Sequence, residues 1–231
     1  MSRRDAYLRE MGLTPLWRAR AGVADTPQTA ETAPVVATPA GDIATMDWAA
    51  LKAAVAGCTR CPLHRTRTQG VFGVGDENAD WLIVGEAPGA DEDAKGEPFV
   101  GQAGKLLDNM LKSIGLKRGV NVYIANVLKS RPPGNRNPEP EEVEACVPYL
   151  KRQIELIRPK LILASGRFAV QFLLGREASI ASLRGRVHDY QGIPVIVTYH
   201  PAYLLRNLPE KAKAWEDLCL ARETMAQSQL K

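Results

Sequence analysis

The fold is decided by the stretch from Trp81 to Leu107, which reads WLIVGEAPGADEDAKGEPFVGQAGKLL. It begins as a short apolar run typical of a buried strand, breaks into a loop rich in glycines and acids, and resumes as an amphipathic helical pattern. In an open α/β sheet such a loop lies at the carboxyl end of a strand, where ligands bind. The amides around Gly101 and Gly104 begin a helix, whose N-terminus favours anions. We therefore expect a binding site in this stretch.

Three further apolar runs alternate with helical patterns along the chain. Alternation of strand and helix is typical of a doubly wound, mainly parallel sheet. The expected fold class is therefore a three-layer α/β/α domain with a central, mainly parallel four-stranded sheet. The four expected strands are Trp81 to Val84, Val122 to Val127, Lys160 to Ala164 and Val195 to Tyr199.

The composition is that of a globular protein. The chain has 231 residues, of which 45% are hydrophobic, and a formal net charge of +4. No run of about 18 apolar residues is present to span a membrane. Charged residues follow Arg3 and Arg4 where a signal peptide would be apolar. We expect a cytoplasmic monomer without a membrane partner, whose mild positive charge permits an anionic partner without establishing one.

The chain divides into two parts. Residues 1–21 have the pattern of a short amphipathic helix, and residues 22–44 have the composition of a flexible linker rich in Ala, Pro and Thr. The folded domain is expected to cover residues 45–231. The favoured role for residues 1–44 is a docking or solubilising appendage, and the alternative is that residues 1–21 bind a protein partner.

The residues that follow the four strands converge at one edge of the sheet, because parallel strands end at the same edge. The first strand is followed by Gly85-Glu86-Ala87 and the second ends at Asn126. The third is followed by Arg167 and the fourth by His200. A carboxylate, an amide, an arginine and a histidine are thus expected around one opening.

Cys58 and Cys61 form a Cys-x-x-Cys pair. In a cytosolic chain this spacing indicates a metal or redox pair rather than a disulfide framework. On its own the motif is of moderate specificity.

Four blocks together resemble a family 4 uracil-DNA glycosylase, the iron–sulfur branch of the uracil glycosylase superfamily. They occur in the family's order and span about residues 46 to 225. The blocks are Cys58-x-x-Cys61, Gly85-Glu-Ala-Pro-Gly89 through Pro98-Phe-Val-Gly101, Asn126-Val-Leu-Lys with Arg131-Pro-Pro-Gly-Asn-Arg136, and His200-Pro-Ala-Tyr-Leu-Leu-Arg206.

The resemblance implies a DNA-repair enzyme that flips uracil out of single- or double-stranded DNA and hydrolyses its N-glycosidic bond, leaving an abasic site. It assigns Phe99 to stacking on the flipped base and Asn126 to reading its edge, since an amide offers both a donor and an acceptor. His200 is implied as the donor that stabilises negative charge on the leaving uracil. The resemblance also assigns Gly85, Glu86 and Ala87 to substrate binding.

The carboxylate that handles the attacking water is left open between two residues. Other branches of the superfamily carry an aspartate where this chain has Ala87. Glu92 resembles the carboxylate proposed for this role, and Glu86 is the second candidate.

The resemblance also implies a DNA-contacting surface. Leu204 is expected as the wedge that fills the gap left by the flipped base, in a loop with exposed apolar residues; the alternative is that the leucines pack under the last helix. Cations are expected along the groove to contact phosphates without reading sequence. These are Arg206, Arg131, Arg136, Lys129 and Arg167.

The same resemblance implies a 4Fe–4S cluster, with one departure. Cys58, Cys61 and Cys146 match three ligand positions, but Ser130 stands where the family has its other cysteine. The occupancy of a cluster here is therefore open, because cluster iron prefers thiolate ligands.

Two other functions compete with base excision. A non-enzymatic nucleic-acid-binding protein with a cysteine metal site would explain the cysteines and the cations but not the acidic loop, Asn126 and His200. A nucleotide-processing enzyme with a phosphate loop is disfavoured, because the stretch from Gly85 to Gly89 lacks the Gly-Lys-Ser/Thr ending.

Overall fold

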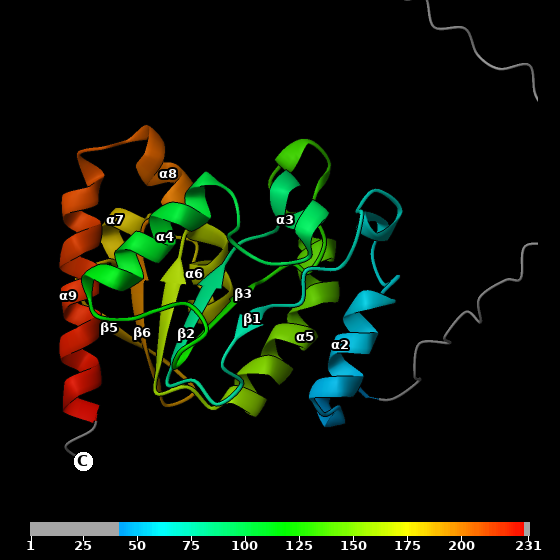
Figure 1. Cartoon of the computed structure of the whole chain (residues 1–231), viewed down its shortest axis with the longest axis horizontal. Coiled ribbons are helices and arrows are strands. Elements are labelled where there is room, and N and C mark those ends of the chain that lie inside the picture. The colour runs from blue at the N-terminus through cyan, green and yellow to red at the C-terminus, as the bar shows by residue number, and fades with distance from the viewer. Residues whose placement is uncertain (1–41, 229–231) are drawn as a thin grey trace, which may run out of the picture. The chain divides into compact units, whose positions relative to one another are not determined.

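The structure is a computed structural model that describes residues 42–228. These residues build one six-stranded sheet in the order β1-β3-β2-β4-β6-β5 (Figure 1). The strands are β1 (Val74–Gly75), β2 (Trp81–Gly85), β3 (Val122–Asn126), β4 (Leu161–Ser165), β5 (Val187–Tyr190) and β6 (Ile193–Thr198).

The four predicted strands are the four central, parallel ones. β2 pairs in parallel with β3 and with β4, and β4 pairs in parallel with β6. β2, β3 and β4 are fully buried, as their unbroken apolar runs predict. The predicted α/β fold class is therefore confirmed.

Two antiparallel edge strands extend this sheet beyond the four that were predicted. β1 has only two residues and pairs with β3, and β5 forms a hairpin with β6. Neither edge strand has a buried residue, so neither gives the apolar run that marks a strand in the sequence. Short, partly polar edge strands are a common way to end a sheet.

Helices cover both faces of the sheet. On one face lie α4, α8 and α9, and on the other lie α5 and α6, so the domain has three layers (Figure 1). Their bounds are α4 (Gln102–Ser113), α5 (Pro140–Ile157), α6 (Arg167–Leu174), α8 (Pro201–Arg206) and α9 (Glu210–Ser228). The smaller elements are α2 (Trp48–Ala56), α3 (Ala90–Lys95), α7 (Ile180–Leu183) and the 3-10 turns η1 (Ile43–Thr45), η2 (Pro62–Arg65) and η3 (Pro133–Asn135).

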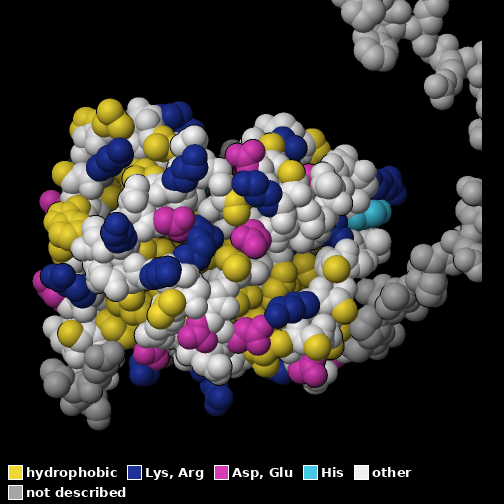
Figure 2. Space-filling view, in the orientation of Figure 1, with side chains coloured by type: hydrophobic (Ala, Val, Ile, Leu, Met, Phe, Trp, Pro, Cys, Tyr) yellow, Lys and Arg dark blue, Asp and Glu magenta, His cyan; other side chains and the backbone are white. Residues whose placement is uncertain are grey.

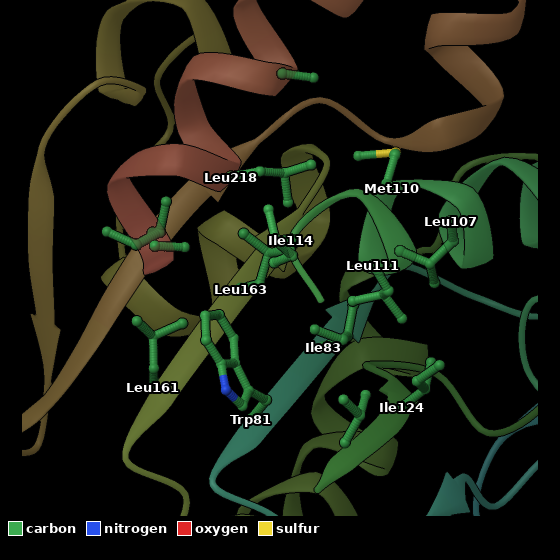
Figure 3. Close-up of a cluster of buried hydrophobic side chains, with 14 of the residues drawn as sticks. Trp81, Ile83, Leu107, Met110, Leu111, Ile114, Ile124, Leu161, Leu163 and Leu218 are labelled. Carbon is green, nitrogen blue, oxygen red and sulfur yellow. The ribbon is translucent and has the colours of Figure 1, made fainter. Parts of the chain in front are cut away.

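The core on the α4 side shows why the first stretch organises the domain. Trp81 and Ile83 of β2 face Leu107 and Leu111 of α4, and all four are buried. Figure 3 shows these side chains meeting those of β3, β4 and α9 between the helices and the sheet. One strand-loop-helix segment thus supplies two layers of this core, and the loop between them is held at the carboxyl edge of the sheet.

The segment after β6 differs from its prediction. Residues 201–206 form helix α8 rather than a loop, with His200 as the N-cap and Pro201 at the first helical position. Proline is favoured there, because its fixed backbone angle suits the first turn and its missing N–H would be unpaired anyway. Six residues are too few to show a helical period in the sequence.

The predicted appendage, residues 1–44, lies almost entirely outside the described residues. Within the described part, Ile43 is buried against α2 and Tyr149 of α5. No helix among residues 42–228 combines the length and apolar character needed to cross a membrane.

Candidate active site

A cavity of about 460 Å³ opens at the carboxyl edge of the sheet. Its lining comes from the loops that follow all four parallel strands, as the strand order predicts. Figure 2 shows the surface hollowed at the top of the view, between the α8 side and the α3 side, with lysine and arginine side chains nearby. Among its lining residues are Glu86, Glu92, Phe99, Asn126, His200 and Arg206.

Asn126 supplies an unpartnered polar atom to this cavity. Its side chain is 2% exposed, and its Oδ1 atom has no hydrogen-bond partner among the described residues. A buried amide oxygen without a partner is costly in a folded protein. This atom is therefore suited to a ligand that donates a hydrogen bond.

Gly85 allows Asn126 and Phe99 to approach each other. A Cβ atom on Gly85 would lie 2.4 Å from Oδ1 of Asn126 and 2.6 Å from Cζ of Phe99. Both distances are too short for any side chain, so only glycine permits this packing. The motif glycine thus sets the spacing between the amide and the aromatic ring.

Phe99 stacks against His200. Their ring centroids are 5.3 Å apart with an interplanar angle of 29°. Phe99 is 5% exposed and has a φ of 55°, in the left-handed region that bulky residues rarely occupy. The predicted stacking residue and the predicted donor therefore lie side by side at the cavity, and the backbone of one is strained.

His200 is held neutral with its proton on a defined atom. Burial, and after it the charge of Arg206, lower its pKa to about 4, against a smaller raising effect from Glu92. The Nδ1 atom accepts a hydrogen bond from the backbone N–H of Ala202 at 3.2 Å. A ring nitrogen that accepts carries no proton, so the neutral ring has its N–H at Nε2.

The two candidate carboxylates have different surroundings. Glu92 is bound by three backbone amides: Oε2 accepts from Gly89 at 3.0 Å, and Oε1 accepts from Val100 at 3.0 Å and Gly101 at 3.2 Å. Glu86 has no such set; burial raises its pKa, and the nearby charge of Arg167 partly offsets this. Glu92 therefore ties the acidic loop to the Phe99 segment.

The predicted cations divide into two groups. Arg206, Arg136 and Arg167 line the cavity, although Arg136 also pairs with the buried carboxylate of Glu142 at 2.6 Å. Arg131 does not line it and donates from Nε to Asn135 at 2.7 Å.

The expectation that Lys129 lines the groove is wrong. Its side chain is 1% exposed, and its Nζ donates to the backbone oxygen of Asn126 at 2.8 Å and to Gln153 at 2.6 Å. Burial lowers the pKa of this lysine to about 7. Lys129 thus supports the strand that carries Asn126 from inside the protein.

The expectation that Leu204 is an exposed wedge is also wrong. Because residues 201–206 form a helix, Leu204 points into the α4 and α9 core and is 1% exposed. Its neighbours Tyr203 and Leu205 are 38% and 40% exposed, and Leu208 is 61% exposed. The alternative of packing therefore holds for Leu204, while the exposed apolar surface belongs to the residues beside it.

Some residues at the site were not singled out from the sequence. Asn135 and Asn137 line the cavity, and the Asn-rich run before α5 was the available signal. Asp93 of the acidic loop is 3% exposed, and each of its carboxylate oxygens accepts from the N–H of Thr68 at 2.9 Å. A buried acid in an acidic run has no sequence signal of its own.

A sequence model described as "Uracil DNA glycosylase superfamily" matches residues 72–219. This chain belongs to the uracil DNA glycosylase superfamily. The matched residues include every strand of the sheet and all the cavity loops described above.

Relatives within the superfamily agree with this assignment. A protein of Archaeoglobus fulgidus named type-4 uracil-DNA glycosylase is 53% identical over 159 residues, which are 65% of this chain and 79% of the relative. One of Thermotoga maritima with the same name is 49% identical over 152 residues, again 65% and 79%. One of Pyrobaculum aerophilum is 43% identical over 185 residues, 76% of this chain and 93% of the relative. The predicted family resemblance is confirmed.

In this superfamily member, Cys58, Cys61, Cys146 and Ser130 are all buried, and we call them the cysteine region. A hydrogen bond from Cys146 lowers the pKa of the Cys61 thiol to about 6, and the same bond together with burial raises that of Cys146. The bond therefore favours ionisation of Cys61 over ionisation of Cys146.

Two side chains from outside the ligand positions complete the cysteine region. Arg67 donates from Nη1 to Oγ of Ser130 at 2.8 Å and from Nη2 to the backbone oxygen of Cys58 at 3.1 Å. Tyr149 donates from its hydroxyl to Sγ of Cys58 at 3.3 Å. The guanidinium therefore connects the Cys58 segment to the Ser130 segment without any metal.

The donor chemistry of the cysteine region fits an iron–sulfur cluster in part. Three buried thiols are the ligand type that cluster iron prefers, and Arg67 is a cation that favours anionic ligands. Among residues 42–228, however, no three histidine, cysteine or acidic side chains lie close enough together to hold a metal ion.

Proposed function

We propose that this chain is a uracil-DNA glycosylase that takes a flipped uracil into the cavity and hydrolyses its N-glycosidic bond, leaving an abasic site in DNA. The observation that carries the proposal is the unpartnered Oδ1 of Asn126 beside the stacked rings of Phe99 and His200. It is supported by membership of the superfamily and by relatives named type-4 uracil-DNA glycosylase.

Asn126 reads the base in this proposal. Its amide accepts from N3–H of uracil and donates to O4, whereas cytosine presents the reverse polarities at those positions. Phe99 supplies the face on which the base stacks. Gly85 and Ala87 form the adjoining wall of the cavity. Any residue larger than glycine at position 85 would collide with the side chain of Asn126.

His200 stabilises the leaving base. Bond cleavage leaves negative charge on uracil O2, and a preorganised donor at that oxygen lowers the barrier. The Nε2–H of the neutral ring is such a donor, because Nδ1 is already occupied by the N–H of Ala202. The depressed pKa keeps the ring neutral at physiological pH.

The carboxylates have separate tasks. Glu92 fixes the cavity loop through its three amide bonds and contributes negative charge that opposes the positive charge of the sugar in the transition state. Glu86, whose carboxylate is not committed to backbone amides of the loop, orients the attacking water. Glu86 thus takes the role that the resemblance gave first to Glu92.

DNA contacts surround the opening. Arg206 and Arg136 lie at the cavity and Arg131 lies beyond it, where each contacts phosphates without reading sequence. Leu205 replaces Leu204 as the wedge, since it is the exposed leucine of α8. Single-stranded substrate is bound as well as duplex, because the unpairing cost is absent there.

The cysteine region holds the cofactor in this proposal. Cys58, Cys61 and Cys146 would hold a 4Fe–4S cluster, and Ser130 stands at the fourth ligand position. The cluster would join the Cys58–Cys61 segment to the Ser130–Cys146 segment. Its contribution is structural, because Asn126, Phe99 and His200, which act on the base, do not belong to the cysteine region.

The test is incubation of the protein with uracil-containing and matched thymine-containing oligonucleotides, followed by cleavage at abasic sites with alkali. Abasic sites are expected only in the uracil strand and also in the presence of EDTA. Strict dependence on magnesium, or strand cleavage without base release, would contradict the proposal. Binding without base release would favour a non-enzymatic DNA-binding protein.

A further inference from the structure

The segment 98–101 places Phe99 at the cavity in a strained backbone conformation. The φ of Phe99 is 55°, and a bulky residue keeps such an angle only where its surroundings hold it. A Cβ atom on Gly104 would lie 1.8 Å from the backbone oxygen of Phe99, so α4 approaches this segment closely. The position of the aromatic ring therefore depends on contacts to the backbone around it.

Two side chains of opposite charge hold this backbone, one by accepting hydrogen bonds and the other by donating them. Glu92 accepts from the N–H groups of Val100 and Gly101. Arg118 donates to the two preceding carbonyls, from Nη1 to Pro98 at 2.9 Å and from Nη2 to Phe99 at 2.7 Å. Consecutive peptide groups are thus fixed by a carboxylate on one side and a guanidinium on the other.

Arg118 itself lies outside the site. It belongs to the turn between α4 and β3 and does not line the cavity. Its Nε donates to Asp108 of α4 at 2.8 Å, and its side chain is 21% exposed. All three of its contacts run to α4 or to the Phe99 segment, so the guanidinium connects the two rigidly.

We propose that Arg118 is a positioning residue for uracil recognition, which acts by holding Phe99 in its strained conformation against His200. The inference rests on the proposed function, because Phe99 matters only if a base stacks on it. The planar fork of arginine binds both carbonyls at once, whereas lysine offers one ammonium group. A loss of either bond would let the ring move relative to Asn126 and His200.

The test compares Arg118→Met and Arg118→Lys with the control Asp108→Asn, which removes the exposed ion pair and leaves both carbonyl bonds. Arg118→Met is expected to lower single-turnover excision roughly ten- to a hundredfold, since small misplacements cost rates of this order. Inhibition by free uracil is expected to weaken by about tenfold on the same grounds. The excision rate of Arg118→Lys is expected to lie between those of Arg118→Met and Asp108→Asn. Binding of abasic-site DNA is expected to stay unchanged.

A second measurement separates this inference from the proposed function. Amide hydrogen exchange of Val100 and Gly101 reports the segment directly, whatever the enzyme does. Faster exchange in Arg118→Met than in Asp108→Asn supports the conclusion that Arg118 holds the Phe99 segment, and if the wild-type chain then releases no uracil, it is the proposed function that fails. Unchanged exchange and unchanged uracil inhibition would overturn it. A parallel loss of abasic-DNA binding and thermal stability would also overturn it, because that pattern indicates a general structural role.

Discussion

The base cavity and the cysteine region differ in whether their buried polar side chains have hydrogen-bond partners within the protein. In the cavity, Oδ1 of Asn126 has no hydrogen-bond partner among the described residues. In the cysteine region, Ser130 is paired with Arg67 and Cys58 with Tyr149. The first is prepared for a ligand from outside, and the second is already satisfied from within.

Substitutions in the two regions are therefore expected to have different effects. A change in the cavity removes an interaction made to the reacting base, so its effect falls on rate. A change in the cysteine region alters how two segments of the chain are joined, so its effect falls on stability. Four predictions test this division.

The largest effect is expected at Asn126. Asn126→Ala is expected to reduce excision about 10²- to 10³-fold, as loss of a preorganised polar group at a reacting centre does. Binding to uracil-containing DNA is expected to change little, because phosphates supply most of the affinity. Single-turnover rates and fluorescence anisotropy measure the two quantities.

Arg206→Ala is the matched contrast for that variant. Removal of the Arg206 guanidinium is expected to weaken DNA binding. It is also expected to reduce the slope of the logarithm of the binding constant against the logarithm of the salt concentration by about 0.9, the value for one phosphate contact. If Asn126→Ala and Arg206→Ala lose binding equally, the separation of base reading from phosphate contact is wrong.

The second prediction separates the two carboxylates. Glu92→Gln places an NH₂ group among three backbone amides, and is expected to cost about 1–3 kcal/mol in the free energy of unfolding. Glu86→Gln is expected to lower excision with a change within about 0.5 kcal/mol in stability, as for substitutions away from buried networks. Chemical denaturation and single-turnover rates distinguish them. An unchanged free energy of unfolding in Glu92→Gln would show that Glu92 has no structural role in the loop.

The sequence predicted the parallel core of the fold and the convergence of its loops, because unbroken apolar runs identify buried strands. It also brought Glu86, Phe99, Asn126 and His200 to one edge. It could not predict the left-handed backbone of Phe99, which depends on Arg118 and on contacts made only in the folded protein.

The wrong expectations have the same origin. Leu204 and Leu205 are adjacent and chemically identical, and only the rotation of the short helix α8 decides which one is exposed. Lys129 stands near arginines in the sequence, but inside the protein Gln153 of α5 accepts a hydrogen bond from its ammonium group. Both outcomes depend on partners more than 20 residues away or on a helix too short to have a period.

The third prediction concerns pH. Because the pKa of His200 is lowered to about 4, the ring stays neutral at all pH values well above 4, and its protonation is expected to cause no loss of excision near pH 6.5. Removing the positive charge in Arg206→Ala relieves one cause of the lowering, so the acid limb is expected to move to higher pH.

The raised pKa of Glu86 acts on the same acid limb, because a protonated carboxyl no longer orients water. Profiles of kcat in Glu86→Gln and in Arg206→Ala separate the two groups. A limb that stays in place in Arg206→Ala would mean that His200 does not determine it.

The smallest effect on chemistry is expected in the cysteine region. A serine hydroxyl is a harder and poorly ionised ligand for cluster iron, and Ser130 is already engaged by Arg67. The wild-type chain is therefore expected to hold an oxygen-sensitive, partly occupied cluster, with Arg67 maintaining the connection between segments when iron is absent. Excision is expected to change little on loss of iron.

Ser130→Cys supplies the missing thiolate and is expected to bind more iron per chain. It is also expected to raise Tm by a few degrees, since about 1 kcal/mol shifts Tm by roughly 2–4 °C in a domain of this size. Ser130→Ala is the control, because it removes the partner of Arg67 without adding a ligand and should lower Tm with no gain of iron. Iron and sulfide analysis of proteins purified without air decides the matter. Full and equal iron in the wild type and in Ser130→Cys would mean that Ser130 ligates adequately, whereas no iron in either, with excision retained, would mean that Arg67 and Tyr149 have taken over the structural task of the cluster.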